Sequence, residues 1–405
     1  MTGVHPIRLP GGFVRDQGID LVNKFAWMHR AVCTGPGGDR YVLSDLTYNH
    51  YRYNDLDRDR QMLAGHVLTR YDPEGAPVAQ VFVEWARAQA GGTFPTVSLS
   101  VLPDGRVLFS AKDNRAWVLD AALGSAEEVT APAAPGEPHW AYRTRLTPSG
   151  RALCLLGENV VAVSADPVGA AWPPELAAVT ALRRTRDGLH TPGYCPPSGR
   201  SGEGEPRTEL VEQVEAAFPG PGTPRLAWLD DVVPVGESMF VAVAGGWRKW
   251  AYKRGGDFLF MLVDADGKLL SHLDLHGYRD SAARGVRYDV VADQARRRIF
   301  HLNTFGLYVF DDTGTRRAVL STGDKEYKPL AQFQLREFGP SGELVLVHEK
   351  QHLVLTVHVP DDLAELPAAV TDALAVFRKG RSQLKKRHAP SNWHWTTGDV
   401  PFTVL

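Results

Sequence analysis

Short runs of apolar residues alternate with polar residues along most of the chain, and Gly, Pro, Asp and Asn residues separate the runs. A period of two residues predicts β-strands that are buried on one face. The clearest stretch is residues 97–124, where a Pro-Asp-Gly turn and an Asp-Asn turn separate three predicted strands, the last ending at Asp120. A fourth strand is predicted near Ala126–Thr130. Because helical periodicity is scarce before residue 360, we expect an all-β fold made of antiparallel strands.

The same arrangement recurs along the chain. A run of apolar residues ends at an Asp, usually with a Gly shortly after it, at Asp72, Asp120, Asp166, Asp264, Asp311 and Asp361. Successive positions are about 48 residues apart, except that the interval from Asp166 to Asp264 is about twice as long. The pattern predicts seven units between residues 25 and 360, and the unit centred near residue 215 has lost its Asp.

Four-stranded units that repeat every 40 to 50 residues or so are typical of a β-propeller, in which each small sheet packs against its two neighbours. The chain resembles the WD40-like β-propeller superfamily in Leu102-Pro103-Asp104-Gly105-Arg106, followed by Trp117-Val118-Leu119-Asp120. The resemblance is architectural and covers roughly residues 25–360. The Gly-His and Trp-Asp dipeptides of the strict WD40 repeat are absent at most expected positions, so the resemblance implies a scaffold or sensor role but assigns no site residues.

Residues 183–224 leave the number of blades open. This stretch is rich in Gly, Pro and charged residues. It is compatible with a degenerate blade that has a long loop, which would make seven blades. It is also compatible with an insertion in a six-bladed propeller. We favour seven blades.

The end of the chain predicts a helix and an incomplete last blade. Apolar spacing becomes helical from Leu363 to Lys386, with Pro367 near the start. The last blade then lacks its outer strand, and unpaired strand edges are a liability. We expect Gly12–Val22 or Val400–Leu405 to complete the blade, and a plain three-stranded blade is the alternative.

The predicted division of the chain follows from these elements. It consists of an N-terminal segment (1–24), a propeller (25–360), a helix (361–388) and a C-terminal tail (389–405).

The composition is that of an ordinary globular protein, and its formal net charge of −2 argues against nucleic-acid binding by the whole molecule. The three cysteines, Cys33, Cys154 and Cys195, have no metal-ligand spacing, so neither a disulfide framework nor a cysteine zinc site is expected. No secretory signal and no long apolar segment is visible, which favours a cytoplasmic protein without a membrane partner. Abundant Ala, Arg, Gly and Pro favour a bacterial source.

Residues 348–352 read His-Glu-Lys-Gln-His, which matches the H-E-x-x-H pattern of zinc peptidases. That chemistry requires both histidines on one face of a helix. Here apolar β-forming runs flank the motif on both sides, at the place where the repeat has its middle turn. We therefore predict a hairpin turn and no metal site.

A second pattern, Asp55-x-Asp57-x-Asp59, begins like a calcium loop. An EF-hand loop then requires Gly at its sixth position and Glu at its twelfth. The chain has Arg60 and His66 there, so we predict an ordinary solvated loop.

Two predicted connections between second and third strands are long and rich in aromatic and basic residues, namely 47–65 and 245–257, and residues 193–206 are a possible third. Such connections lie on one face of a propeller, and aromatic and Arg residues are enriched in binding surfaces. We predict a binding face that includes Tyr51, Tyr53, Arg58, Trp247, Arg248, Trp250, Tyr252 and Lys253. The alternative is that these loops fold back over the blade edges.

The most consistent interpretation is a non-catalytic scaffold or sensor that binds a protein or peptide on this face, as part of a bacterial multi-component system. The alternative is a hydrolase or lyase with its site at the channel mouth on the same face, where His50 and His190 are candidates. A third hypothesis is that Trp247, Arg248, Trp250 and Lys253 recognise an anionic ligand by stacking and charge. No cofactor motif is present, so no cofactor is expected.

Overall fold

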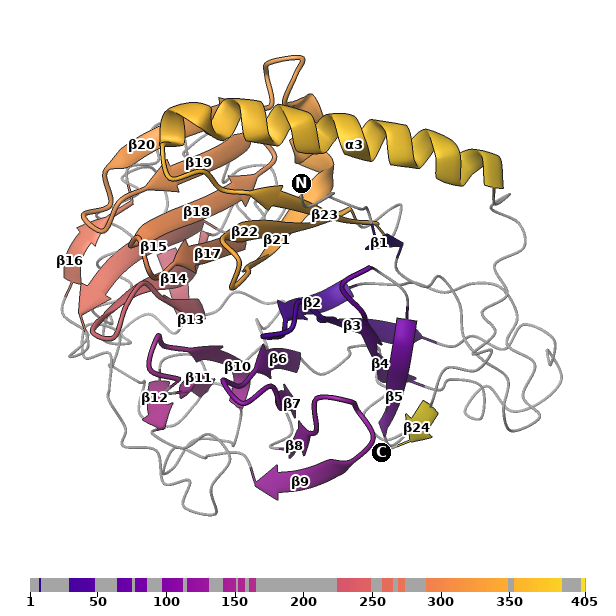
Figure 1. Cartoon of the computed structure of the whole chain (residues 1–405). Coiled ribbons are helices and arrows are strands. Elements are labelled where there is room, and N and C mark those ends of the chain that lie inside the picture. The colour runs from indigo at the N-terminus through magenta and orange to yellow at the C-terminus, as the bar shows by residue number, and fades with distance from the viewer. Residues whose placement is uncertain are drawn as a thin grey trace, which may run out of the picture. The chain divides into compact units, whose positions relative to one another are not determined.

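The computed structural model of the chain describes residues 7–8, 29–47, 64–74, 77–85, 97–111, 115–130, 141–150, 152–156, 160–164, 224–248, 257–264, 269–273, 289–348, 353–387 and 402–404. These residues form small antiparallel sheets, one long helix and two 3₁₀ turns (Figure 1). The fold is all-β with the repeated four-stranded sheets of a β-propeller, as predicted, followed by the predicted C-terminal helix.

The first three sheets consist of strands between residues 29 and 164, and sheet 1 also contains β24. Sheet 1 contains β2 (His29–Thr34), β3 (Arg40–Thr47), β4 (Ala64–Tyr71), β5 (Pro77–Trp85) and β24 (Phe402–Val404). Sheet 2 contains β6 (Val97–Val101), β7 (Val107–Ala111), β8 (Arg115–Leu119) and β9 (Ala126–Thr130). Sheet 3 contains β10 (Ala141–Leu146), β11 (Ala152–Leu156) and β12 (Val160–Ser164).

The other three sheets consist of strands that follow residue 223, and sheet 6 also contains β1. Sheet 4 contains β13 (Pro224–Pro234), β14 (Met239–Arg248), β15 (Asp257–Asp264) and β16 (Leu269–His272). Sheet 5 contains β17 (Asp289–Asp293), β18 (Arg298–Asn303), β19 (Gly306–Phe310) and β20 (Arg316–Ser321), and the turn η5 (Lys328–Gln332) follows it. Sheet 6 contains β1 (Ile7–Arg8), β23 (Leu353–His358), β22 (Glu343–His348) and β21 (Phe333–Phe338).

The predicted count of seven or six four-stranded blades is not what the described residues show. They form five sheets with four or more strands, and sheet 3 has three strands. The seventh unit was expected near residue 215, between sheet 3 and sheet 4, and this stretch lies outside the described residues. The long interval between Asp166 and Asp264 therefore corresponds to the step from sheet 3 to sheet 4.

The recurrent Asp residues mark the ends of third strands. Asp72, Asp120 and Asp311 directly follow β4, β8 and β19. Asp264 is the last residue of β15, and Asp361 comes shortly after β23. The repeat predicted from these positions is thus a repeat of one structural position, the turn that leads from the third strand to the outer edge.

Asp311 shows why an aspartate suits this turn. Its carboxylate accepts hydrogen bonds from the backbone N–H groups of Thr313 at 2.9 Å and Thr315 at 3.0 Å. Burial raises the pKa of the Asp311 carboxyl, but these bonds and those from the Thr313 hydroxyl and Arg317 outweigh it, and the pKa is lowered overall. Asp120 accepts equivalent bonds from the backbone N–H groups two and four residues later. Each Asp therefore satisfies the backbone donors of a tight turn.

Strands from near both chain ends join sheets whose other strands are consecutive. β1 pairs antiparallel with β23, with Ile7 opposite Val354 (Figure 1). The fourth strand of sheet 6 therefore comes from upstream of Gly12–Val22, which lies outside the described residues. The other expected segment, Val400–Leu405, contains β24, but β24 pairs in parallel with β5 of sheet 1 rather than with sheet 6.

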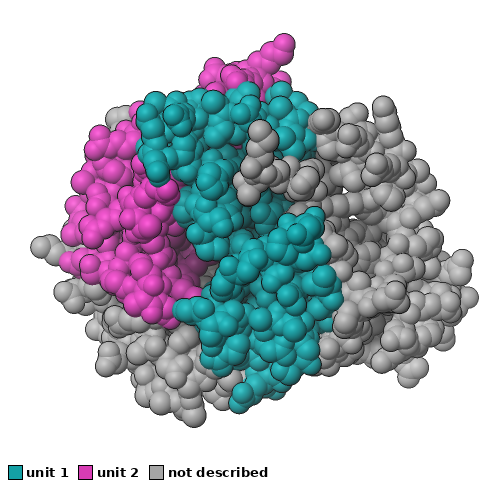
Figure 2. All heavy atoms as spheres, in the orientation of Figure 1, with its two compact units in different colours: residues 1–109, 117–128, 332–405 teal, residues 110–116, 129–331 magenta. Residues whose placement is uncertain are grey.

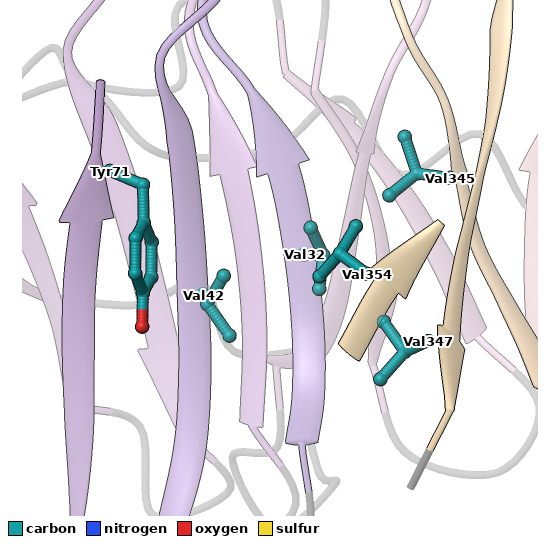
Figure 3. Packing of buried hydrophobic residues seen from close by; sticks show 6 residues of the cluster. All are labelled: Val32, Val42, Tyr71, Val345, Val347 and Val354. Atoms are coloured by element: carbon teal, nitrogen blue, oxygen red, sulfur yellow. The ribbon is translucent and has the colours of Figure 1, made fainter. Parts of the chain in front are cut away.

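The chain divides into two compact units, coloured in Figure 2. Unit 1 comprises residues 1–109, 117–128 and 332–405, and unit 2 comprises residues 110–116 and 129–331. The core of unit 1 includes an apolar cluster in which sheets 1 and 6 meet (Figure 3). Its members are all nearly inaccessible to solvent and are Val32, Val42, Tyr71, Val345, Val347 and Val354.

Sheets 4 and 5 pack together inside unit 2. Phe260 of sheet 4 lies 4.6 Å, between ring centroids, from His301 of sheet 5. His301 is fully buried, and its Nδ1 lies 3.1 Å from the carbonyl oxygen of Asp289. Burial lowers the pKa of His301 to about 4, against the opposing effect of this hydrogen bond. His301 is therefore a neutral core residue of the β-sheet packing.

The C-terminal helix covers β23 within unit 1. A 3₁₀ turn, η7 (Leu363–Glu365), is capped by Asp362 and leads into α3 (Leu366–Arg387), close to the predicted range. The buried face of α3 has the helical spacing expected of an amphipathic helix and consists of Leu366, Val370, Ala373, Leu374 and Phe377.

Candidate functional site

Two connections between second and third strands are long, as predicted. Residues 48–63 join β3 to β4, and residues 249–256 join β14 to β15. In the other four sheets the same connection is short and consists of residues 112–114, 157–159, 304–305 and 349–352. The long second-to-third connections therefore belong to sheets 1 and 4.

The strands that carry the two long connections are also extended. The β3–β4 and β14–β15 ladders each contain eight residue pairs, against five or six in β11–β12, β18–β19 and β22–β23. At about 3.4 Å per residue, two or three extra pairs lengthen a hairpin by roughly 10 Å. Each long connection thus lies at the tip of a hairpin that is longer than its counterparts.

The predicted binding residues lie mostly beyond the described part of the chain. Trp247 and Arg248 are the last two residues of β14, with Leu226 and Pro224 as their partners in β13. The six others lie in residues 48–63 and 249–256, outside the described residues, and are Tyr51, Tyr53, Arg58, Trp250, Tyr252 and Lys253. The structure places Trp247 and Arg248 at the base of one long connection, and the binding role of all eight stays a prediction.

The H-E-x-x-H motif lies on a hairpin. β22 ends at His348 and β23 begins at Leu353, and these two residues are opposite each other. His348 is buried, and its Nε2 lies 2.9 Å from Oε1 of Gln332. Its ring stacks on Phe377 of α3 with 5.5 Å between centroids. His348 therefore packs α3 against sheet 6, and this first residue of the motif ends a β-strand, whereas residues 349–352 lie outside the described ranges.

A polar cluster not predicted from the sequence joins sheet 1 to sheet 6. The backbone N–H of Thr34, at the end of β2, donates to Oε1 of Glu337 in β21 at 2.8 Å. The Thr34 hydroxyl donates to Oε2 of the same carboxyl group, also at 2.8 Å. One glutamate carboxyl group thus accepts hydrogen bonds from both the backbone N–H and the hydroxyl of one threonine, across the junction between the two sheets.

The electrostatics of this Thr34–Glu337 pair are unusual. Burial is the largest effect on the pKa of Glu337 and raises it, as does the nearby carboxyl of Glu343. The hydrogen bonds from Thr34 and the charge of Arg40 lower this pKa, and the net result is a pKa of about 7. Burial also lowers the pKa of Arg40, although both glutamates oppose this. Glu343 is 5% exposed, and its Oε2 has no hydrogen-bond donor. The cluster therefore holds two carboxyl groups and one guanidinium in a poorly solvated junction.

A matching pair occurs inside unit 2. The backbone N–H and the hydroxyl of Ser149, after β10, donate to the two carboxylate oxygens of Glu237, after β13. Sheets 3 and 4 are thus linked by the same two-donor arrangement as sheets 1 and 6. Both pairs link neighbouring sheets near the first turn of each sheet. We therefore interpret them as structural contacts between sheets rather than as catalytic groups.

One sequence signal for the Glu337 cluster existed. In the sequence of β21, Glu337 continues the period of two set by Phe333 and Leu335, although a bulge between Leu335 and Glu337 breaks that register in the structure. An acidic residue in phase with apolar positions indicates a possible buried polar cluster. Nothing in the sequence pairs it with Thr34, which lies about 300 positions earlier, because the contact depends on sheets 1 and 6 being neighbours.

The described residues lack two further kinds of feature. Within the ranges given above, no group of three or more His, Cys, Asp and Glu residues is arranged to hold a metal ion. Among those same residues, no helix is long and apolar enough to cross a membrane.

No family model matches the chain, and no curated protein matches its sequence. Among solved structures, the WD40 domain of Pan2 from Neurospora crassa is 10% identical with a TM-score of 0.38, over 82% of this chain and 89% of that one. The Cps50 (Swd1) β-propeller domain from Myceliophteria thermophila is 11% identical with a TM-score of 0.36, over 82% of this chain and 86% of that one.

A third match is hydrazine synthase from Kuenenia stuttgartiensis, 12% identical with a TM-score of 0.38, over 89% of this chain and 86% of that one. The chain resembles WD40-like β-propellers in architecture, as its repeated sheets indicate. At these identities and TM-scores none of the matches transfers an activity or a partner to it.

Proposed function

We propose that the chain is a non-catalytic propeller scaffold or sensor that binds a protein or peptide through its long second-to-third connections, residues 48–63 and 249–256. A cytoplasmic location and a role in a bacterial multi-component system are part of this proposal. It rests mainly on one observation, that among the second-to-third connections of the described sheets only those of sheets 1 and 4 are long.

The position of the connections supports the proposal. In a four-stranded meander, the first-to-second and third-to-fourth turns lie at one end, and the second-to-third connection lies at the other. Each long connection is therefore at the end of its sheet where the chain enters and leaves. In propellers these ends belong to one face, which commonly carries function on loops held by a rigid scaffold.

The chemistry of the connections suits a protein or peptide partner. They contain Tyr, Trp and Arg, which dominate the energetics of protein interfaces because they combine large apolar area with hydrogen bonding. Trp247 and Arg248 extend this composition into β14. Long loops of this kind cost ordering entropy, which favours a functional reason for their length.

The enzyme alternative receives no comparable support. Glu337, a described carboxyl group whose pKa is raised to about 7, lies in β21 close to the first turn of sheet 6. That is the opposite end of the sheet from residues 349–352, where a site on the proposed face would require it.

The test is affinity capture from the native cell with the full chain as bait. Trp247→Ala/Trp250→Ala should remove at least one partner that the wild-type chain captures. Leu270→Ala/Val319→Ala is the matched control, because it truncates two exposed apolar residues on outer strands of unit 2 and should leave the partners unchanged. An identical set of partners for all three baits would overturn the proposal.

A further inference from the structure

The fifth strand of sheet 1 stands apart from the rest of the fold. β24 pairs with β5 in parallel, whereas the other described strand pairs of sheets 1, 3, 4, 5 and 6 are antiparallel. No other sheet in the described ranges has more than four strands. β24 is thus an addition to a sheet that is already complete (Figure 1).

The addition is short compared with the edge that receives it. β5 spans Pro77–Trp85, but β24 covers only Gln80, Val81 and Phe82. On the other side of β5, β4 is paired with β5 along eight positions. Among the described residues, β24 therefore pairs with only three positions of the outer edge of β5.

β5 is also a strand whose edge favours pairing. Its sequence, PVAQVFVEW, is rich in β-forming residues and contains one charged residue, Glu84. Long apolar edge strands are templates for further strands, and proteins normally protect them. Here the protecting element is a segment of three residues.

Gln80 gives an independent sign that the occupant is incomplete. Its side chain is 1% exposed, and its Nε2 donates to Thr69 Oγ1 at 2.8 Å. Oε1 is buried without a donor. If the amide is turned over, the other end lacks a partner instead, so one polar group stays unsatisfied in either orientation, which is costly in a core.

The register shows where the missing group would come from. Thr69, Gln80 and Phe402 form one row across β4, β5 and β24. Residues directly opposite one another carry their side chains on the same face of a sheet. A Ser, Thr or Asn opposite Gln80, in place of Phe402, would bring a hydrogen-bonding group beside the unsatisfied amide.

We infer that the outer edge of β5 is a second peptide-binding site, which the chain's own segment Phe402–Val404 occupies and blocks. The ligand is an extended segment of a partner protein that adds as a parallel strand, with β-forming apolar residues flanking a Ser, Thr or Asn opposite Gln80. Strand addition of this kind takes affinity from main-chain hydrogen bonds and specificity from alternate side chains. This site is separate from the long connections, so the two proposals stand or fall independently.

The test uses the full chain and a fluorescein-labelled peptide of residues 398–405 that carries Phe402→Thr. Thr403→Pro/Val404→Pro opens the edge, because the backbone N–H of one of these two consecutive residues must point toward β5, and proline has no N–H. The matched control, Thr403→Val/Val404→Thr, keeps composition and strand propensity. By fluorescence anisotropy, the opened chain should bind the peptide at least ~10-fold more tightly than the control, because the tethered segment competes at high effective concentration.

Further arms make the result specific. Phe402→Gly/Val404→Gly opens the edge without proline and should behave like the first variant, and circular dichroism confirms that each is folded. Gln80→Leu in the opened chain should lower the affinity for the Thr-containing peptide by roughly five-fold or more. It should leave the affinity for the peptide that keeps Phe402 unchanged.

Three outcomes would overturn the inference. The first is no binding to either opened chain. The second is equal affinity for the opened and control chains. The third is a dimeric wild type with a monomeric opened chain by light scattering, which would assign the edge to the tail of a second copy.

Discussion

Glu337 carries a carboxyl group whose ionisation opposes the packing of sheet 1 against sheet 6. Burial, with a contribution from Glu343, raises its pKa from 4.5 to about 7. A group with a raised pKa stabilises the fold fully below its unfolded pKa, and that contribution is lost as pH rises through the folded pKa. We predict that the free energy of unfolding, measured in urea, falls between pH 4.5 and 7, with a slope below about 1.4 kcal/mol per pH unit from this group.

Glu337→Gln isolates this effect. Its amide can accept from the backbone N–H of Thr34 and donate to the Thr34 hydroxyl, so it mimics the protonated acid. The variant should lose the part of the pH dependence that Glu337 supplies and should exceed the wild type in stability above pH 7. Glu74→Gln is the matched control because Glu74 is exposed on sheet 1, and it should retain the wild-type slope. Parallel slopes for all three proteins would contradict the prediction.

Gly314 is required by both backbone and space. Its φ is +83°, and a Cβ added there would lie 2.6 Å from the carbonyl oxygen of His272. Gly314→Ala should therefore lower the free energy of unfolding by about 2 kcal/mol or more. Gly236→Ala in the same unit should change it by about 0.5 kcal/mol or less, because nothing lies within 4 Å of the added Cβ. Equal effects in thermal unfolding would refute the stereochemical explanation.

At the scale of elements, the packing of α3 on sheet 6 is centred on the aromatic ring of Phe377. Phe377 is 2% exposed and packs against Phe333 with 4.9 Å between ring centroids, and against His348. Phe377→Ala should cost about 3 kcal/mol in urea unfolding and increase amide exchange along α3. Asp372→Ala, on the exposed face of the same helix, should change stability by less than about 0.5 kcal/mol. A small effect of Phe377→Ala would show that other contacts hold the helix.

The local elements were predictable because their causes are local. The Asp turns are fixed by hydrogen bonds to backbone groups two and four residues later, as around Asp311, so they recur as a visible pattern. The helix begins close to the predicted position because Asp362 caps the preceding turn. The hairpin at His348 followed from the apolar runs on either side of it.

Contacts between distant segments were not predictable to the same degree. β1 and β24 contain two and three residues, which is too short for any periodicity to appear. Their registers are decided by the edges that they meet, β23 and β5. The Thr34–Glu337 pair depends in the same way on the meeting of sheets 1 and 6. The prediction of the number of blades failed for a related reason, since residues 167–223 lack the repeated Asp.

At the scale of the whole molecule, the described chain consists of small, regular β-sheets, and two of their hairpins carry connections that are longer than the others. Regular sheets give a rigid support, and the added length gives a surface that differs from repeat to repeat. This division explains why the repeat predicts the fold but not the partner. In the proposed function, the partner is selected by residues such as Trp247, which stand outside the repeating pattern.

Hydrogen–deuterium exchange of the full chain, with and without a captured partner, tests the proposed binding face most directly. We predict that the partner slows exchange in both residues 48–63 and residues 249–256, and that Trp247→Ala/Trp250→Ala abolishes this protection. Protection confined to other segments, with unchanged exchange in these two, would contradict a binding face built from the long connections.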